Sequence, residues 1–298
     1  MTVTNKKFVA WGHKYPHRIQ DTFAYIYASY SKAFQSLGYE VFHLDSNDDI
    51  SGINFDNAIF FTHGPVERGI PLIKTAKYIL HHCDEDKYEN FNYIKVQIPT
   101  NGKEKSLGFS GNKLDDLTYY DETTKNLFQP WATDLLPSEI GDNFQFRDKK
   151  TCAYVGTRGG GYHGNLHELN ALAASCKENG YIFQYHRPCS ISFEENRQII
   201  NESEIAPTIL GRWQNINDYV PCRFFKNISY GKVGITNSHA ANALVQGNTI
   251  CNTSDILMED YLSTSKKKQK KMFEDSVKLI REKHTYINRI QRILSCLE

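Results

Sequence analysis

Apolar residues follow two alternating patterns along the first half of the chain. A continuous apolar run at residues 8–11 precedes a segment in which apolar side chains recur every three or four positions, and a second strand-like run follows at 39–44. The recurring positions are Phe23, Ile26, Tyr27, Tyr30, Ala33, Phe34 and Leu37. This spacing predicts an amphipathic helix, with Asp21 and Gly38 as its caps. The order strand, helix, strand predicts a parallel sheet.

The same alternation begins again near residue 149. Strands are expected at 149–157, 181–186, 205–210 and 232–237, and helices at 166–179, 193–203 and 221–231. We therefore predict an α/β protein with two Rossmann-like domains that face each other across a cleft. The joint is expected in the polar segment 137–150, which gives domains at 1–143 and 144–270. Apolar positions at helical spacing in 271–298 predict a C-terminal helix that packs back on the N-terminal domain.

Composition and charge narrow the range of partners. The 298 residues include 35 Lys and Arg against 34 Asp and Glu, so the net charge is +1 and neither nucleic acid nor an anionic membrane is expected as the main partner. No stretch approaches the roughly 18 apolar residues of a membrane span, and the first residues lack the apolar core of a signal peptide. The seven cysteines are scattered and include no CxxC pair. These features predict a cytoplasmic protein with reduced thiols.

A glycine-rich segment, Tyr154–Asn165, joins the first strand and the first helix of the second half. Gly159, Gly161 and Gly164 match the G-x-G-x-x-G pattern of dinucleotide-binding proteins. That pattern also requires an acidic residue at the end of the next strand, where this chain has His186 and no carboxylate. An enzyme that binds NAD or FAD is therefore only an alternative. A bare backbone at a helix N-terminus still favours an anion, and we expect a diphosphate there rather than a turn alone.

A second segment, Gly211–Ser238, adds cations, amides and hydroxyls. Arg223 and Lys226 lie one turn apart on one face of the predicted helix, although such cations can also be ordinary surface charges. Guanidinium groups suit phosphate because they bind it through two parallel hydrogen bonds. The residues predicted to hold the diphosphate, ribose and sugar of a donor are Gly156, Arg158, Gly159, Gly160, Gly161, His186, Arg212, Arg223, Lys226, Asn237 and Ser238.

The layout of the chain and the segment DYVPCRFFKNISYGKVGITN, residues 218–237, resemble GT-B-fold glycosyltransferases of the spore-maturation-protein-like and large-virus kind. The closing HTYINRIQRIL is similar to their last helix, and the 218–236 run is similar to the donor motif of fucosyltransferases. The resemblance implies a metal-independent hexosyl- or deoxyhexosyltransferase without a cofactor. It also implies a UDP- or GDP-linked sugar on the C-terminal half and a glycan or other hydroxyl acceptor on the N-terminal half. Many members carry a glutamate near Lys226, so its absence argues against a retaining mechanism based on a pair of glutamates.

The loop after the first strand gathers groups suited to the chemistry. Sugar transfer with inversion needs a base for the proton of the acceptor hydroxyl, and His13, His17 and Asp21 are the predicted candidates. Arg18 and His63 are predicted to bind the acceptor, and Arg18 also has the charge to offset the departing diphosphate. The alternative for the histidines is a structural or solvated role, and for Asp21 a helix cap alone.

The run HHCDED, residues 81–86, resembles the acidic metal-binding triplet of the other large glycosyltransferase fold, and its alternative is a solvated loop. Because GT-B enzymes generally work without this triplet, no metal site is predicted. A nucleotide-sugar epimerase shares the predicted fold and is the main alternative function.

Overall fold

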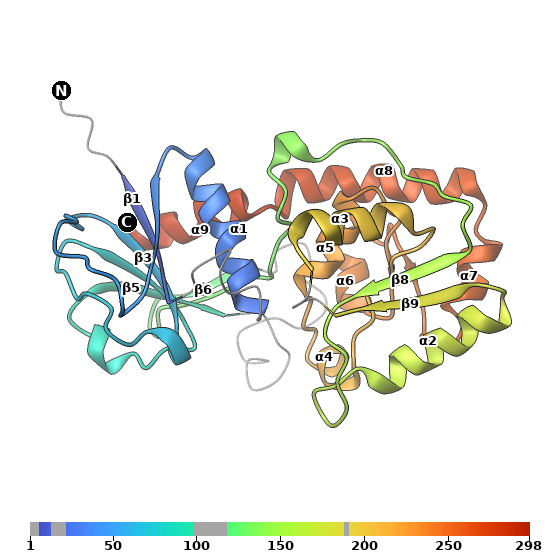
Figure 1. Cartoon of the computed structure of the whole chain (residues 1–298), viewed down its shortest axis with the longest axis horizontal. Helices are drawn as coiled ribbons and strands as arrows, with labels where there is room; N and C mark the ends of the chain where they lie inside the picture. Colours follow the sequence, from blue (N-terminus) through green and yellow to red (C-terminus); the bar gives the residue numbers. More distant parts are fainter. Residues whose placement is uncertain (1–5, 13–21, 98–117, 188–190) are drawn as a thin grey trace. The chain divides into compact units, whose positions relative to one another are not determined.

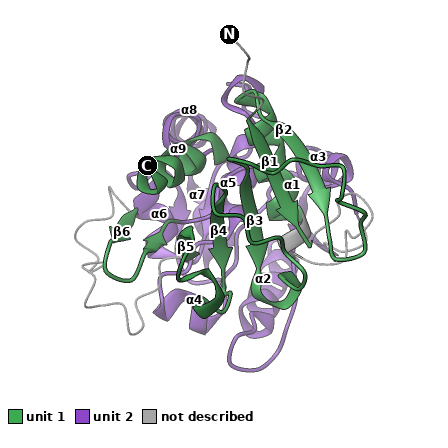
Figure 2. Cartoon of the chain, turned by 90° about the vertical axis from the view of Figure 1, so that its left-hand side faces the viewer, with its two compact units in different colours: residues 1–97, 118–129, 286–298 green, residues 98–117, 130–285 purple. Residues whose placement is uncertain are grey.

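The computed structural model of the chain describes residues 6–12, 22–97, 118–187 and 191–298 (Figure 1). The chain forms two compact units, which Figure 2 distinguishes by colour. Among the described residues, unit 1 comprises 6–12, 22–97, 118–129 and 286–298, and unit 2 comprises 130–187 and 191–285. The described chain passes from unit 1 to unit 2 at residues 129–130 and back at 285–286, whereas the sequence suggested boundaries at 143 and 270.

Unit 1 is built on a seven-stranded sheet in the order β2-β1-β3-β4-β5-β7-β6. Its strands are β1 (Lys7–Trp11), β2 (Glu40–Leu44), β3 (Ile59–His63), β4 (Lys77–His81), β5 (Asn92–Gln97), β6 (Tyr119–Asp121) and β7 (Asn126–Phe128). All neighbours pair in parallel except β6 and β7, which are antiparallel. The central strands read as continuous apolar runs because helices and loops cover both faces of such a sheet.

Two helices from opposite ends of the chain pack together in unit 1, α1 (Thr22–Ser36) and α9 (Tyr286–Leu297). Phe34 of α1 stacks on Phe8 of β1 with ring centroids 3.9 Å apart, and Tyr27 stacks on Phe61 of β3 at 4.4 Å. The apolar periodicity of α1 thus becomes the buried face that fixes it on the sheet. Two single-turn 3₁₀ helices, η1 (Gly64–Val66) and η2 (Asp86–Tyr88), follow β3 and β4.

Unit 2 contains two short parallel strand pairs, β8 (Thr151–Val155) with β9 (Ile182–His186) and β10 (Ile235–Thr236) with β11 (Ile250–Cys251). Residues 205–210, expected as a strand, form only isolated bridges from Ile205 to Cys152 and from Thr208 to Thr236. This prediction was wrong, because Pro207 lies between the two bridges and has no N–H to donate to a ladder.

Helices surround these strands in unit 2. They are α2 (Leu166–Glu178), α3 (Phe193–Glu202), α4 (Arg212–Ile216), α5 (Cys222–Ser229), α6 (His239–Leu244), α7 (Leu257–Ser263) and α8 (Lys266–Lys283), with a 3₁₀ turn η5 (Pro137–Glu139) before β8. Within the described residues, no helix has the length and apolar character needed to cross a membrane.

The C-terminal stretch is divided between the units. Helix α8 packs on α5 within unit 2, and α9 packs on α1 within unit 1. The break falls at His284, whose backbone carbonyl accepts a hydrogen bond from the N–H of Thr133 at 3.1 Å. The last helix therefore does pack on unit 1, but the helical stretch before it belongs to unit 2.

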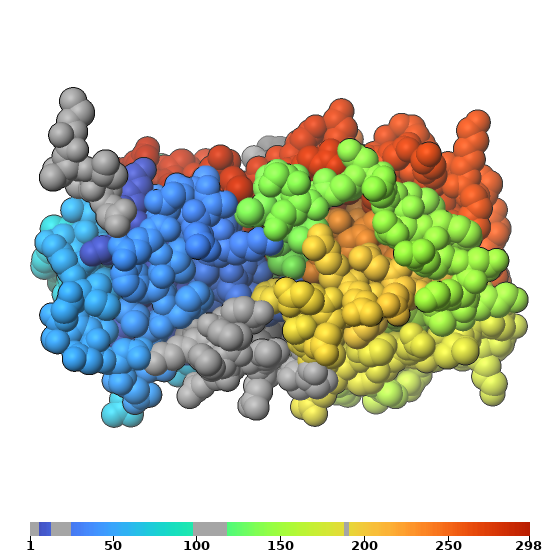
Figure 3. Space-filling model, turned by 45° about the horizontal axis from the view of Figure 1, so that its top comes forward, coloured from blue at the N-terminus to red at the C-terminus, as the bar shows by residue number. Residues whose placement is uncertain are grey.

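The polar segment 137–150, expected as a joint, lies along α8 inside unit 2, as the space-filling view also shows (Figure 3). Arg281 of α8 donates to the carbonyl of Ile140 at 3.0 Å, and Phe273 of α8 contacts Phe144 with ring centroids 5.4 Å apart. The segment is therefore anchored to unit 2 by these contacts, although most of its residues are exposed.

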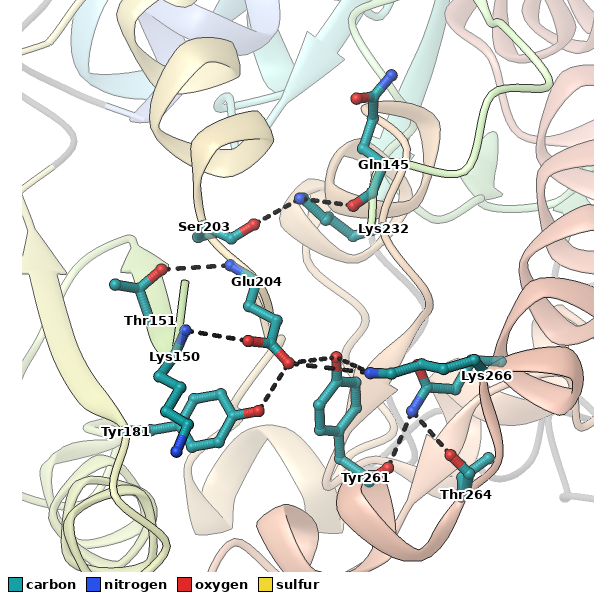
Figure 4. A network of polar contacts seen from close by, with 11 residues as sticks. Gln145, Lys150, Thr151, Tyr181, Ser203, Glu204, Lys232, Tyr261, Thr264 and Lys266 are labelled. Carbon is teal, nitrogen blue, oxygen red and sulfur yellow. Dashed lines mark hydrogen bonds and ion pairs between the residues drawn. The ribbon is translucent and has the colours of Figure 1, made fainter. Parts of the chain in front are cut away.

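A buried polar network lies at the amino ends of β8 and β9 (Figure 4). The Glu204 carboxylate is 6% exposed and accepts hydrogen bonds from the hydroxyls of Tyr181 (2.6 Å) and Tyr261 (3.1 Å) and from the N–H of Lys150 (3.0 Å). The Nζ of Lys232, which is 1% exposed, donates to the carbonyls of Gln145 (2.9 Å), Asn201 (3.1 Å) and Ser203 (2.6 Å). The buried carboxylate of Glu204 and the buried ammonium group of Lys232 therefore both have hydrogen-bond partners in the protein.

Candidate functional site

The candidate site lies at the carboxyl ends of β8 and β9 in unit 2. Residues 156–165 connect β8 to the N-terminus of α2, so the predicted Arg158 and Gly159–Gly161 lie on the strand-to-helix turn. In open α/β sheets this edge is the one at which ligands bind. The backbone N–H groups of the first turn of α2 and the helix dipole both favour a negative charge there.

Asn165 holds the turn in shape. Its side-chain amide donates to the hydroxyl of Tyr154 at 2.6 Å and to the carbonyl of Thr157 at 3.2 Å, and its Oδ1 accepts from the N–H of Gly159 at 3.3 Å. Because these bonds occupy the side chain, Asn165 stands at the N-cap position of α2 without capping the helix. The start of α2 thus lacks the side-chain acceptor that most helices provide.

The glycines of this region fall into two groups. A side-chain carbon at Gly164 would overlap the carbonyl oxygen of Gly159, and one at Gly211 would overlap the carbonyl oxygen of Gly164. At Gly159 and Gly160, in contrast, the nearest atom would be 3.9 Å away, an ordinary contact. The packing of the protein therefore requires glycine in the first group, whereas no neighbouring atom crowds the backbone at Gly159 and Gly160. An uncrowded backbone of this kind allows a ligand to approach closely.

Gly156 leaves room for the side chain of Arg223. A side chain there would overlap the guanidinium group of Arg223, which also lies over the ring of Tyr154 at 4.5 Å and donates from Nη2 to the carbonyl of Ile209 at 3.3 Å. The Nε of Arg223 is buried and has no hydrogen-bond partner among the described residues. These contacts fix the half-buried guanidinium beside the strand-to-helix turn.

Arg158 contacts a second tyrosine, which stacks against Tyr154. It lies over the ring of Tyr185 at 5.9 Å and donates to Asn170 Oδ1 at 3.1 Å. Tyr185 in turn stacks against Tyr154, with ring centroids 6.4 Å apart. Two tyrosines at the ends of neighbouring strands thus connect the arginine of the glycine-rich turn to the arginine of α5.

The arginines of this edge lack anionic partners. Within the described ranges, Arg158, Arg212 and Arg223 form no ion pair with a carboxylate, and Arg212 is exposed at the start of α4 next to Gly211. Three guanidinium charges beside uncrowded glycines and a helix N-terminus form a site complementary to an anion.

Lys226 is in a different environment. It is 6% exposed, and burial lowers the pKa of its ammonium group while the negative charge of Asp134 opposes that shift. Asp134 also accepts a hydrogen bond of 2.8 Å from Tyr230, whose ring lies 5.9 Å from the Lys226 Nζ. The carboxylate of Asp134 therefore interacts electrostatically with Lys226. Contact of Lys226 with a donor phosphate stays a prediction.

Three further predicted donor residues have backbone contacts in the structure. Asn237 pairs with Leu210 in both directions, accepting from its N–H and donating to its carbonyl at 2.8 Å each. Ser238 caps α6 by accepting from the N–H of Ala241 at 3.2 Å. The carbonyl of His186 accepts from the N–H of Gly156 at 3.1 Å, while its buried Nε2 has no partner among the described residues. Asn237 and Ser238 therefore support the turns around the site.

Sequence reasoning missed the residues that support the predicted ones. Tyr154, Tyr185 and Asn165 position the arginines and the turn, and Trp213 packs against His163 of the turn with ring centroids 4.9 Å apart. The place of Asn165 directly before the helix was visible in the sequence, but its hydrogen bonds to Tyr154 and Thr157 were not. The stacking of Tyr154 on Tyr185 depends on strand pairing, which the sequence did not specify.

The predicted residues of the first half are only partly described. His13, His17, Arg18 and Asp21 lie outside the described residues. His63 ends β3 in unit 1, is 8% exposed, and lies near His81 at the end of β4 with ring centroids 5.3 Å apart. Within the described residues, no three His, Cys, Asp or Glu side chains come together as a possible metal site.

Comparison with family models and with curated protein sequences gives no match. Solved structures, however, are similar over nearly the whole chain. An alpha,alpha-trehalose 6-phosphate synthase from Burkholderia multivorans is 8% identical with a TM-score of 0.50, and the match covers 93% of this chain and 75% of that one. The chain has the GT-B fold that the sequence resemblance implied.

Two glucosyltransferases are similar over nearly the full length of both chains. A DNA-modifying beta-glucosyltransferase, solved with and without its substrate uridine diphosphoglucose, is 12% identical with a TM-score of 0.50; the match covers 98% of this chain and 99% of that one. An alpha-glucosyltransferase, solved with UDP and a 13-mer DNA, is 8% identical with the same score and the same coverage. At these identities the likeness concerns the fold.

Proposed function

We propose that this chain, which has the fold of the GT-B glycosyltransferases, transfers a sugar from a nucleoside-diphosphate sugar to a hydroxyl acceptor. The observation that carries the proposal is the carboxyl edge of the unit 2 sheet. There Arg158, Arg212 and Arg223 have no carboxylate partner in the described residues, and Gly159 and Gly160 are bare without being crowded. An anion with two phosphate groups suits this combination of fixed guanidinium charge and accessible backbone.

We propose a UDP- or GDP-linked donor, with its diphosphate between Arg158 of the turn and Arg223 of α5. The diphosphate is the leaving group of the reaction, so the cations that bind it also stabilise the charge that develops as it departs. Arg212, His186, Asn237 and Ser238, which the sequence predicted as donor-binding residues, are proposed to lie around the ribose and sugar end. Lys226 is proposed to add charge behind Arg223, one helical turn away.

The acceptor is proposed to bind on unit 1, at the carboxyl edge of its sheet, where His63 ends β3. The predicted base candidates His13, His17 and Asp21, and the predicted acceptor contact Arg18, follow β1 in the sequence and lie outside the described residues. We propose a glycan or small hydroxyl acceptor rather than DNA because a net charge of +1 gives no overall attraction to a polyanion.

Two alternatives share parts of this site. A nucleotide-sugar epimerase would bind the same donor and is distinguished by the absence of transfer to an acceptor. An NAD- or FAD-dependent enzyme would need a carboxylate at the end of β9 for a ribose hydroxyl, and that strand ends at His186. We propose in addition that transfer needs no metal and that the protein works in the cytosol. Its six cysteines in the described residues are all free thiols, which suits a reducing compartment.

The test is a panel of nucleotide sugars scored by thermal shift, followed by a transfer assay with the donor that binds. A donor that binds only the folded protein at about 100 times its Kd stabilises it by roughly 2.7 kcal/mol, enough to raise Tm visibly. The expected result is a shift with one nucleotide class and release of its diphosphate when acceptor is added. No shift with any UDP- or GDP-linked sugar would contradict the proposal, and turnover without acceptor would favour the epimerase.

A further inference from the structure

Three imidazole rings gather at the carboxyl edge of the unit 1 sheet. His63 ends β3, His81 ends β4, and His82 follows β4 directly. The ring centroids lie 4.2 Å apart for His81 and His82, 5.3 Å for His63 and His81, and 6.3 Å for His63 and His82. The first two rings are buried, at 8% and 2% exposure, whereas His82 is exposed.

The topology places this cluster where ligands bind in such sheets. The strand order β2-β1-β3-β4-β5 is that of doubly wound sheets in which the direction of the chain reverses between β1 and β3. Ligands of these sheets occupy the crevice outside the carboxyl ends at that point. His63 belongs to one of the two strands that flank it, and His82 follows the next strand.

The backbone at His82 is held in an uncommon conformation. Its φ angle is +51°, in the left-handed region that side chains other than glycine rarely adopt. Gly64, which follows His63, packs so closely on this turn that a side chain there would overlap the carbonyl oxygen of His82. Strained backbone that the surrounding structure enforces is concentrated at functional sites.

Burial and the neighbouring imidazoles lower the pKa values of these rings and so favour their neutral form. Burial lowers the pKa of His81 to about 2, and the neighbouring His82 and His63 add to that shift. Partial burial also lowers the pKa of His82 below its usual 6.5. Glu67, which follows η1, pairs with Lys87 at 3.1 Å and accepts from Tyr88 at 3.1 Å. Within the described residues His82 forms no ion pair with a carboxylate.

We propose that His82 takes the proton from the acceptor hydroxyl, with His63 and His81 as the residues that position its ring. The proposal rests on the proposed function. In the step, the acceptor oxygen bonds to the anomeric carbon as its O–H bond breaks, and the proton moves to a ring nitrogen of His82. The bond from the anomeric carbon to the diphosphate oxygen breaks, and its electron pair leaves with the nucleoside diphosphate.

The experiment compares the full-length parent with His82→Ala and His82→Gln, with the exposed His239→Ala as the matched control. Loss of a general base lowers kcat by about 10² to 10⁴, while the Kd of the donor, measured by titration with the nucleoside diphosphate, stays at the parent value. Added imidazole should restore part of the rate to His82→Ala. The parent rate should fall as the pH drops below the His82 pKa, and His82→Ala should lose that limb.

Different failures separate the two proposals. If the parent transfers sugar and His82→Ala keeps a near-parent kcat, His82 is not the base, although the enzyme is still a glycosyltransferase. A loss confined to His13, His17 or Asp21 variants would also overturn the assignment of His82. If the parent binds and turns over no nucleotide sugar, both proposals are overturned. If His82→Ala unfolds, His82→Gln, which keeps the side-chain size, gives the rate comparison.

Discussion

The two ends of the β8–β9 pair in unit 2 have opposite polar chemistry. At the amino end, Glu204 accepts from two tyrosine hydroxyls and a backbone N–H, and Lys232 donates to three carbonyls. At the carboxyl end, Arg158 and Arg223 lie on tyrosine rings without a carboxylate partner in the described residues. The charged groups at the amino end are bonded within the protein, whereas the arginines at the carboxyl end can still pair with an anionic ligand.

This difference separates residues that stabilise from residues that bind. A buried charge with all its partners in the protein gains nothing from a ligand, and its removal leaves those partners without hydrogen bonds. A cation that the protein positions but does not neutralise retains electrostatic energy that a bound anion can realise. The same rule divides the glycines into those that the packing requires and those that it leaves open.

The largest expected effect is at the amino end of the β8–β9 pair. Glu204→Leu leaves the hydroxyls of Tyr181 and Tyr261 and the N–H of Lys150 without their shared acceptor. We expect a loss of about 3–5 kcal/mol in the free energy of unfolding, because each buried donor left without an acceptor costs roughly 1–3 kcal/mol. Urea denaturation followed by fluorescence measures it. Donor affinity per folded molecule should stay at the parent value. A change in that affinity with unaltered stability would contradict the assignment of Glu204 to stability rather than to binding.

The next largest effect is expected at the carboxyl end of the β8–β9 pair. Arg223→Ala removes a charged contact to the proposed diphosphate, and such losses cost roughly 1.5–3 kcal/mol, or about ten- to a hundredfold in Kd. Calorimetric titration with UDP and GDP measures the change. Arg147→Ala is the control, because Arg147 is exposed and its Nε contacts the carbonyl of Asn201 at 3.4 Å, near the amino end. Equal affinities for parent and Arg223→Ala would place the diphosphate elsewhere.

A pair of glycine substitutions gives the smallest and sharpest contrast. Gly164→Ala forces a side chain onto the carbonyl of Gly159 and should destabilise the fold by about 1–3 kcal/mol, the usual range for overpacking. Gly160→Ala meets its nearest neighbour, a Leu166 side-chain carbon, at 3.9 Å and should leave Tm within a few degrees of the parent. Only Gly160→Ala is expected to weaken donor binding in a fully folded protein. Thermal melts and titrations of both variants decide this, and a stable Gly160→Ala with parent affinity would remove this glycine from the site.

The sequence predicted those features that depend on local pattern. Apolar periodicity identified α1, and the helix expected at 166–179 is α2. Apolar runs identified β1 and β8 because these strands are buried on both faces. The strand expected at 205–210 failed at Pro207, whose missing N–H limits pairing to single bridges. The helix expected over the last stretch is two helices, because His284 bonds to Thr133, a partner far away in the sequence.

The candidate site divides in the same way. Arg158 and the glycines were found because a strand, a glycine run and a helix are adjacent in the sequence. The backbone roles of Asn237 and Ser238 were not predicted, since the pairing of Asn237 with Leu210 exists only after two distant turns meet. The cluster of His63, His81 and His82 likewise depends on the pairing of β3 with β4, although each residue was noted in the sequence.

Hydrogen–deuterium exchange with and without UDP or GDP reports where in the chain the ligand protects the backbone. If the nucleoside diphosphate binds at the carboxyl edge of unit 2, we expect slower exchange for the amides of residues 157–168, at the glycine-rich turn and the start of α2, and unchanged exchange around Lys150 and Glu204 at the amino end. Protection confined to unit 1, or to the amino end of β8, would contradict the claim that the carboxyl edge of unit 2 holds the nucleoside diphosphate.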